Sequence, residues 1–274
     1  MGTNMSTGPD IAATRRFGET VDFGRTAQDY RAHRAGFPSP FFERIARQLD
    51  LRPGQAALDM GTGTGTVARG LARLGLAVTG IDPAAALLRE AMEIDQTEGV
   101  AVAYREGRAE ALDAPDCSFD LVSAGQCWHW FDRARAAHEA FRVLKPGGAI
   151  VIAHFDWLPL PGNVVEATET LILSVNPAWT MGGGSGLYPA WLADLAQAGF
   201  EGIETASFDV DQPYGHDAWC GRIRASAGVR ASLDEAATER FAIELKALLQ
   251  RTFPEDPLLV PHRVWWALAR RPQS

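Results

Sequence analysis

The sequence predicts an α/β fold: a doubly wound, seven-stranded, mostly parallel Rossmann-like sheet with an inserted lid after strand five. Two observations carry this prediction. Short apolar runs alternate with helical patterns between about residues 56 and 155, and a glycine-rich turn joins the first run to the first helix. Such runs are typical of a parallel sheet that is buried on both faces. The expected strands are residues 56–60, 77–82, 102–107, 119–125, 149–155, 203–210 and 260–271.

Helices are expected where apolar residues recur every three or four positions. Residues 40–50 show the pattern clearly, since four residues lie near one face of a helix: Phe41, Phe42, Ile45 and Leu49. The expected helices are residues 25–36, 40–50, 66–75, 83–94, 133–144, 164–175, 191–199, 215–226 and 232–253.

The chain is expected to form one domain over residues 25–274, after a polar leader at residues 1–24. The alternation of strands and helices breaks after Phe155, where a Pro- and Gly-rich stretch begins. We therefore expect a lid insertion at about 156–190 and a helical segment at about 215–253.

Composition indicates an ordinary globular protein, with 46% hydrophobic and 22% charged residues. The chain has 26 Lys and Arg residues and 34 Asp and Glu residues, which gives a net charge of −8. It therefore has no overall positive field that would attract a nucleic acid. No apolar run approaches the ~18 residues that predict a membrane span. The three cysteines lack metal-ligand spacing, which favours a reduced, cytoplasmic protein with no metal site. The oligomeric state cannot be inferred.

The glycine-rich turn reads LDMGTGTGT over residues 58–66. Gly61, Gly63 and Gly65 allow the backbone to approach a nucleotide ligand closely, because glycine has no Cβ. NAD, FAD and S-adenosylmethionine (SAM) enzymes all use such a turn. The spacing here is GxGxG, with Asp59 before it, whereas a dinucleotide site has GxGxxG.

Asp82 ends the second expected strand, seventeen residues after Gly65. In a doubly wound fold this position places a carboxylate where a ribose lies, so Asp82 is expected to accept from the ribose hydroxyls. The same carboxylate can cap a helix that begins at Pro83, and the two roles are compatible.

These motifs resemble the class I SAM-dependent methyltransferases, in particular the small-molecule (type 11, trans-aconitate-methyltransferase-like) group. LDMGTGTG is similar to the first motif of that family, and Asp82 to its ribose acid. EGRAEAL, SFDLV and the LKPGG turn before strand five match later motifs in the same order. The resemblance covers residues 25–155 well.

The resemblance implies a SAM site built from the first motif and several later residues. It places the three glycines at the methionine and ribose parts of SAM, and Ala109 and Glu110 beside the adenine. Many relatives have an Asp where this chain has Arg108, which has only donors and cannot accept from the adenine amino group. Tyr30 and Arg34 resemble residues that close over the methionine end, and Gln126 is expected at the amino acid portion.

Two histidines are candidates for a general base. His154 ends the fifth expected strand, and His129 follows the fourth, on the side where doubly wound folds bind ligands. His129 also lies in a segment, HWF, that relatives share whatever their substrate, so a packing role is an alternative. Methyl transfer from a sulfonium needs a base only when the acceptor loses a proton.

Aromatic residues of the insertion and the later helical segment are candidates for an acceptor pocket, although they can equally form the core of the lid. These residues are Trp157, Trp179, Met181, Tyr188 and Trp219.

The resulting hypothesis is an enzyme that transfers a methyl group from SAM to a small-molecule acceptor, of the kind found in secondary metabolism. The alternatives are a non-catalytic SAM-binding module and an NAD-dependent oxidoreductase. The acceptor, and whether its O, N or C atom is methylated, remain open.

Overall fold

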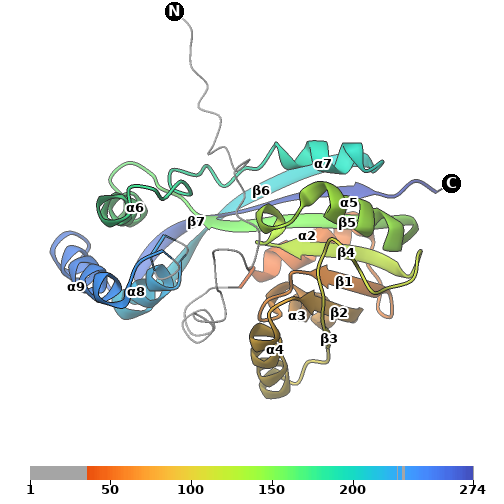
Figure 1. Cartoon of the computed structure of the whole chain (residues 1–274), viewed down its shortest axis with the longest axis horizontal. Coiled ribbons are helices and arrows are strands. Elements are labelled where there is room, and N and C mark those ends of the chain that lie inside the picture. Colours follow the sequence, from red (N-terminus) through yellow and green to blue (C-terminus); the bar gives the residue numbers. More distant parts are fainter. Residues whose placement is uncertain (1–35, 227, 230–231, 274) are drawn as a thin grey trace, which may run out of the picture. The chain divides into compact units, whose positions relative to one another are not determined.

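The computed structural model describes residues 36–226, 228–229 and 232–273. Its seven strands form one sheet in the order β3-β2-β1-β4-β5-β7-β6, which confirms the predicted fold (Figure 1). Strands β1 to β5 pair in parallel. The strands are β1 Ala56–Met60, β2 Ala77–Asp82, β3 Ala103–Glu106, β4 Phe119–Gly125, β5 Leu144–Trp157, β6 Glu201–Tyr214 and β7 Leu258–Arg270.

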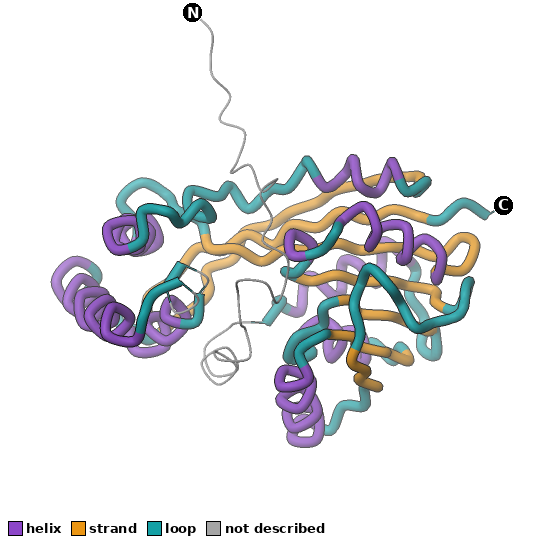
Figure 2. The backbone as a smooth tube through the Cα atoms, in the orientation of Figure 1, coloured by secondary structure: helices purple, strands orange, loops and turns teal. Residues whose placement is uncertain are grey.

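Helices separate the first five strands along the chain, except β3 and β4, which a loop connects (Figure 2). A short 3-10 helix, η2 (Trp128–Trp130), follows β4. The α-helices are α2 Ser39–Leu49, α3 Thr66–Arg73, α4 Ala85–Glu98, α5 Arg133–Val143, α6 Val164–Val175, α7 Trp191–Gln197, α8 His216–Arg224 and α9 Glu235–Thr252. The helix expected at residues 25–36 falls outside the described residues, apart from Gly36, which is not helical.

Several expected boundaries are wrong, and local contacts explain two of them. Helix α4 begins at Ala85 rather than Pro83, because Ala84 is extended and its N–H bonds to the Asp82 side chain. The expected turn at residues 144–148 belongs to strand β5. There Gly147 has φ +76 and donates to the carbonyl of Arg271, so the motif is a strand irregularity held by the C-terminal segment.

The described chain forms two compact units. Of the described residues, the sheet unit comprises 36–155, 188–208 and 264–273. The helical unit comprises residues 156–187 and 209–263. The expected insertion and the later helical segment therefore belong largely to the same unit, although 75 residues separate Trp157 from Ser232 in the sequence.

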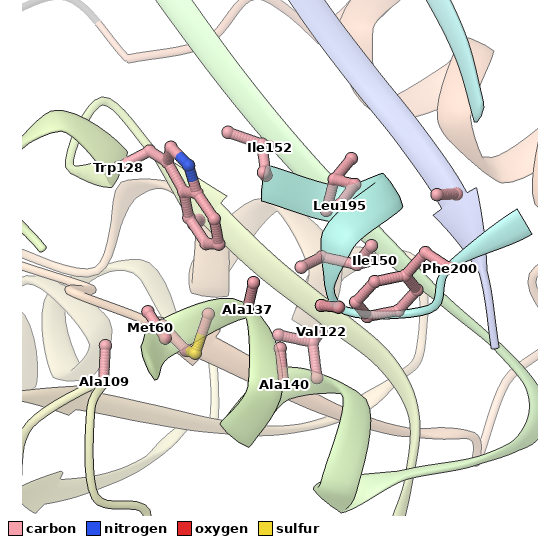
Figure 3. Packing of buried hydrophobic residues seen from close by; sticks show 14 of the residues in the cluster. Met60, Ala109, Val122, Trp128, Ala137, Ala140, Ile150, Ile152, Leu195 and Phe200 are labelled. Carbon is pink, nitrogen blue, oxygen red and sulfur yellow. The ribbon is translucent and has the colours of Figure 1, made fainter. Parts of the chain in front are cut away.

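The core of the sheet unit lies where α5 and α7 pack on each other and cover β4 and β5 (Figure 3). Trp128 and Trp191 are among its fully buried side chains. The Trp128 indole N–H donates to Asp194 at 2.9 Å, which joins η2 to α7. A buried indole N–H requires such a partner, so this bond fixes the segment that follows β4.

His262, on β7 in the helical unit, is 2% exposed, and its Nδ1 bonds to the carbonyl of Val260 at 2.9 Å. Burial lowers the pKa of His262 to about 4. The unfolded chain takes up this proton near pH 6.5, so the unfolded state binds more protons between about pH 6.5 and 4. Stability is therefore lost as the pH falls through that window.

We expect His262→Gln to remove this acid sensitivity, which is worth about 3 kcal/mol at 1.36 kcal/mol per pKa unit. The test is urea unfolding of both proteins at pH 7.5 and pH 4. The wild type should lose more of its free energy of unfolding than the variant. His138→Gln, at an exposed histidine, is the matched control and should lose as much as the wild type. Equal losses in wild type and His262→Gln would contradict the expectation.

Candidate SAM site

The glycine-rich turn follows β1 and leads into α3. Gly61, Gly63 and Gly65 have φ values of +61, +55 and +79, a region that side chains disfavour. A Cβ on Gly61 would lie 2.9 Å from the Cys127 Sγ. Among the described residues, nothing lies within 4 Å of a Cβ on Gly63. The outer two glycines are therefore packed against protein, and the middle one faces open space.

Asp82, at the end of β2, holds this turn. One carboxylate oxygen accepts from the Gly63 N–H and the other from the Ala84 N–H, both at 2.9 Å. Asp82 is 4% exposed, and burial raises its pKa. A carboxylate has about four acceptor positions. Two of them remain for a ligand hydroxyl, so the geometry suits the predicted ribose contact. The predicted capping role is wrong, because Asp82 accepts from the N–H of Ala84, which is itself the N-cap residue of α4, rather than from an N–H of the helix.

Asp59 lies beneath the turn, with only 1% of the residue exposed. Its carboxylate accepts from the hydroxyls of Thr62 and Ser123, each at 2.7 Å. Burial raises the pKa of Asp59 to about 6. The structure therefore places the Asp59 carboxylate where it ties the turn to β4.

The expected adenine-side residues follow β3. Ala109 is 3% exposed and joins the hydrophobic core beside Met60 (Figure 3). The Glu110 carboxylate accepts from the Asp132 N–H at 3.0 Å and lies 3.7 Å from the Arg108 guanidinium. The side chains of both expected residues are thus used to shape the loop.

Gln126 is the first residue after β4, and it adopts φ +61. Its side-chain amide donates to the carbonyl of Phe155 at 3.0 Å, which fixes the carboxamide. The other amide atom, Oε1, is buried and has no hydrogen-bond partner in the described part of the chain. Since β4 neighbours β1, Gln126 lies at the switch point of the sheet, where ligands of such folds bind.

The two candidate histidines lie in one aromatic cluster of the sheet unit. His129 and His154 are each 6% exposed, and their ring centroids are 5.3 Å apart. The Tyr188 ring lies 4.5 Å from His154 and stacks on Trp191 at 4.1 Å. The fold thus brings together three residues that the sequence proposed separately.

The other expected pocket residues lie in the helical unit. Trp219 is fully buried and donates to the Thr168 hydroxyl at 3.1 Å. The Trp157 indole donates to Glu169 at 2.8 Å, and its ring lies 5.6 Å from that of Trp219. These contacts form part of the core of that unit.

Trp179 and Met181 lie in the glycine-rich segment that follows α6. Trp179 packs against Gly182 and Gly228, and Met181 is 43% exposed. An acceptor role for these residues stays a prediction. The predicted Tyr30 and Arg34 lie outside the described residues.

Sequence reasoning missed several residues that shape the site. Ser123 and Thr62 hold Asp59, while Arg69 reaches the turn from α3. Hydroxyls and arginines are common on surfaces, so no sequence pattern distinguished them.

Within the described ranges, no helix is long and apolar enough to cross a membrane. Nor does any cluster of three or more His, Cys, Asp or Glu residues there suit a metal ion.

The central part of the chain is similar to known proteins. Residues 58–152 match a family described as a methyltransferase domain. The chain is 33% identical over 131 residues to an uncharacterized methyltransferase of Mycobacterium tuberculosis, covering 48% of this chain and 51% of that protein. It thus spans about half the length of this relative.

Two further similarities extend beyond this region. The chain is 29% identical over 226 residues to the 27-O-demethylrifamycin SV methyltransferase of Amycolatopsis mediterranei, covering 79% of this chain and 78% of that protein. Its fold is similar to phosphoethanolamine N-methyltransferase 2 of Haemonchus contortus, solved with S-adenosylhomocysteine, with a TM-score of 0.56. That likeness has 22% identity and covers 91% of this chain and 58% of the other.

The family match begins in β1 and ends in β5, so it contains the glycine turn, Asp82 and Gln126. It confirms the resemblance that the motifs predicted, while the trans-aconitate-like subgroup stays a prediction. Residues 58–152 of this chain match the methyltransferase domain family, in agreement with the predicted resemblance to class I SAM-dependent methyltransferases.

Proposed function

We propose that this chain transfers the methyl group of SAM to a small-molecule acceptor and releases S-adenosylhomocysteine. The observation that carries the proposal is the Asp82 carboxylate bonded to the Gly63 N–H, beside the one glycine of the turn whose Cβ direction is open. Asp82 would accept from the ribose, and the Gln126 Oε1 from the ammonium group of the methionine end. The SAM sulfonium supplies a methyl group that is already activated for in-line displacement.

The proposed acceptor is a small molecule of secondary metabolism, methylated on oxygen. A relative that matches 79% of this chain carries the name 27-O-demethylrifamycin SV methyltransferase, which supports this choice. N- and C-methylation remain alternatives that product analysis distinguishes.

The three free cysteines support the predicted cytoplasmic location, which also stays a proposal.

Isothermal titration of the wild-type protein with S-adenosylhomocysteine, beside NADH, tests the cofactor. Micromolar binding of the first and none of the second is expected. Binding of NADH alone would favour the oxidoreductase alternative. Once binding of S-adenosylhomocysteine is established, catalysis is tested by incubating the protein with methyl-labelled SAM and a panel of phenolic, hydroxylated and carboxylic acceptors. Binding without label transfer to any acceptor would favour the non-catalytic module.

We propose His154 as the general base for a hydroxyl acceptor, because it lies near the C-terminal end of β5, three positions before Trp157, beside Tyr188 and His129. His154→Ala should lower kcat for such an acceptor by about 10²- to 10⁴-fold, the usual contribution of a positioned base. S-adenosylhomocysteine affinity should not change. His138→Ala, at an exposed histidine, is the control. An unchanged kcat in His154→Ala would exclude a base at this position.

A further inference from the structure

Arg69 is buried beneath the glycine turn although it carries a charge. It lies on α3, only 6% exposed. Its Nη1 pairs with Asp95 of α4, which is 5% exposed, and its Nη2 donates to the carbonyl of Thr64 at 2.8 Å. The third nitrogen, Nε, lies 3.3 Å from Glu98. The fork of the guanidinium thus joins α4 to the turn.

A buried ion pair is weak evidence for stability, because the cost of removing two charges from water offsets their attraction. Apolar residues of similar volume often serve stability as well or better. A contribution to stability therefore does not explain why the Arg69–Asp95 pair is buried here. The one backbone group that it bonds, the Thr64 carbonyl, lies between Gly63 and Gly65.

A turn with three glycines at positive φ has more conformational freedom than other backbone and must be held from outside. Asp82 holds the Gly63 N–H from the β2 side. Arg69 holds the Thr64 carbonyl, at the next residue along the chain, from α3. The two anchored groups belong to the peptides on either side of the Gly63–Thr64 peptide. Asp82 accepts a hydrogen bond there and Arg69 donates one.

We propose that Arg69 and Asp95 are positioning residues for cofactor binding: the buried pair holds the Thr64 carbonyl and thereby keeps the turn in its ligand-receiving conformation. Asp95 balances the charge of Arg69, so that a cationic cofactor does not meet an uncompensated guanidinium. This inference rests on the proposed function, in which the turn binds SAM. Preorganisation of this kind increases affinity by removing the cost of ordering the loop.

The test is the double variant Arg69→Met with Asp95→Leu, which replaces the pair by apolar side chains. We expect its urea midpoint to stay near that of the wild type. Its affinity for S-adenosylhomocysteine should fall at least about tenfold, the loss that corresponds to one hydrogen bond to a charged group. Arg73→Met is the control and should change neither value. Arg73 is an exposed arginine of α3, the helix of Arg69, and it pairs with Glu98 of α4.

A stable double variant that binds S-adenosylhomocysteine as tightly as the wild type would overturn the inference. If the double variant does not fold, Arg69→Lys decides, because it keeps the charge beside Asp95 but replaces the fork by one nitrogen. The same tenfold loss is expected there, and unchanged affinity contradicts the inference. A wild-type protein that binds no S-adenosylhomocysteine would instead contradict the proposed function, so the two failures are distinguishable.

Discussion

Replacing Asp82 by alanine is expected to lower the affinity for S-adenosylhomocysteine by at least about a hundredfold. The variant loses the proposed bonds to the ribose, and each hydrogen bond to a charged group contributes about 1.5–3 kcal/mol. It also releases the Gly63 N–H, which Asp82 holds at 2.9 Å. Isothermal titration measures the affinity, and urea unfolding reports any loss of stability.

Asp120→Ala is the matched control for this experiment. The Asp120 carboxylate also accepts from a backbone N–H of β1, that of Ala56, at 2.8 Å. It pairs with Lys145 as well. Ala56 begins β1, whereas the glycine turn follows its other end. Asp120→Ala should therefore reduce stability and leave the affinity unchanged. Similar affinities of Asp82→Ala and wild type would contradict the ribose contact.

Alanine substitutions in the glycine turn are expected to have two different effects. Gly65→Ala should destabilise the protein by roughly 2–5 kcal/mol, the sum of a left-handed backbone and an overpacked side chain. Its Cβ would lie 2.1 Å from the Tyr104 hydroxyl. Gly63→Ala has open space, so only the backbone cost of about 1–2 kcal/mol applies.

Gly63→Ala should nevertheless lose S-adenosylhomocysteine binding, because its methyl group would occupy the space proposed for the cofactor. Gly99→Ala separates this effect from backbone strain. Gly99 has φ +66 and is the C-cap residue of α4, and in the described part of the chain its Cβ would also meet nothing within 4 Å. It should cost similar stability with unchanged affinity. Wild-type affinity in Gly63→Ala would show that no ligand approaches there.

The predicted contacts with SAM depend on side chains that the protein itself already uses. Asp82 holds the turn with one acceptor position on each oxygen, and Gln126 is fixed by its bond to Phe155. A side chain held in this way loses little freedom when a ligand binds. The same residues can therefore support the fold and present acceptors to the cofactor.

Local patterns in the sequence were sufficient to predict the sheet and the cofactor turn. Continuous apolar runs predicted the strands of the sheet unit, and β1, β2 and β4 match their expected bounds. Glycine spacing predicted the turn, because only glycine tolerates its φ values and close contacts. The start of α4 was missed, since Pro83 is compatible with both a helix and an extended residue.

Tertiary structure alone decided which distant residues share a site. His129, His154 and Tyr188 meet because β4, β5 and the segment before α7 converge, and no local period encodes that convergence. The Arg69–Asp95 pair looks in the sequence like two surface charges, 26 residues apart. Periodicity reports which face of an element is apolar, whereas burial of a charge depends on which elements pack against it.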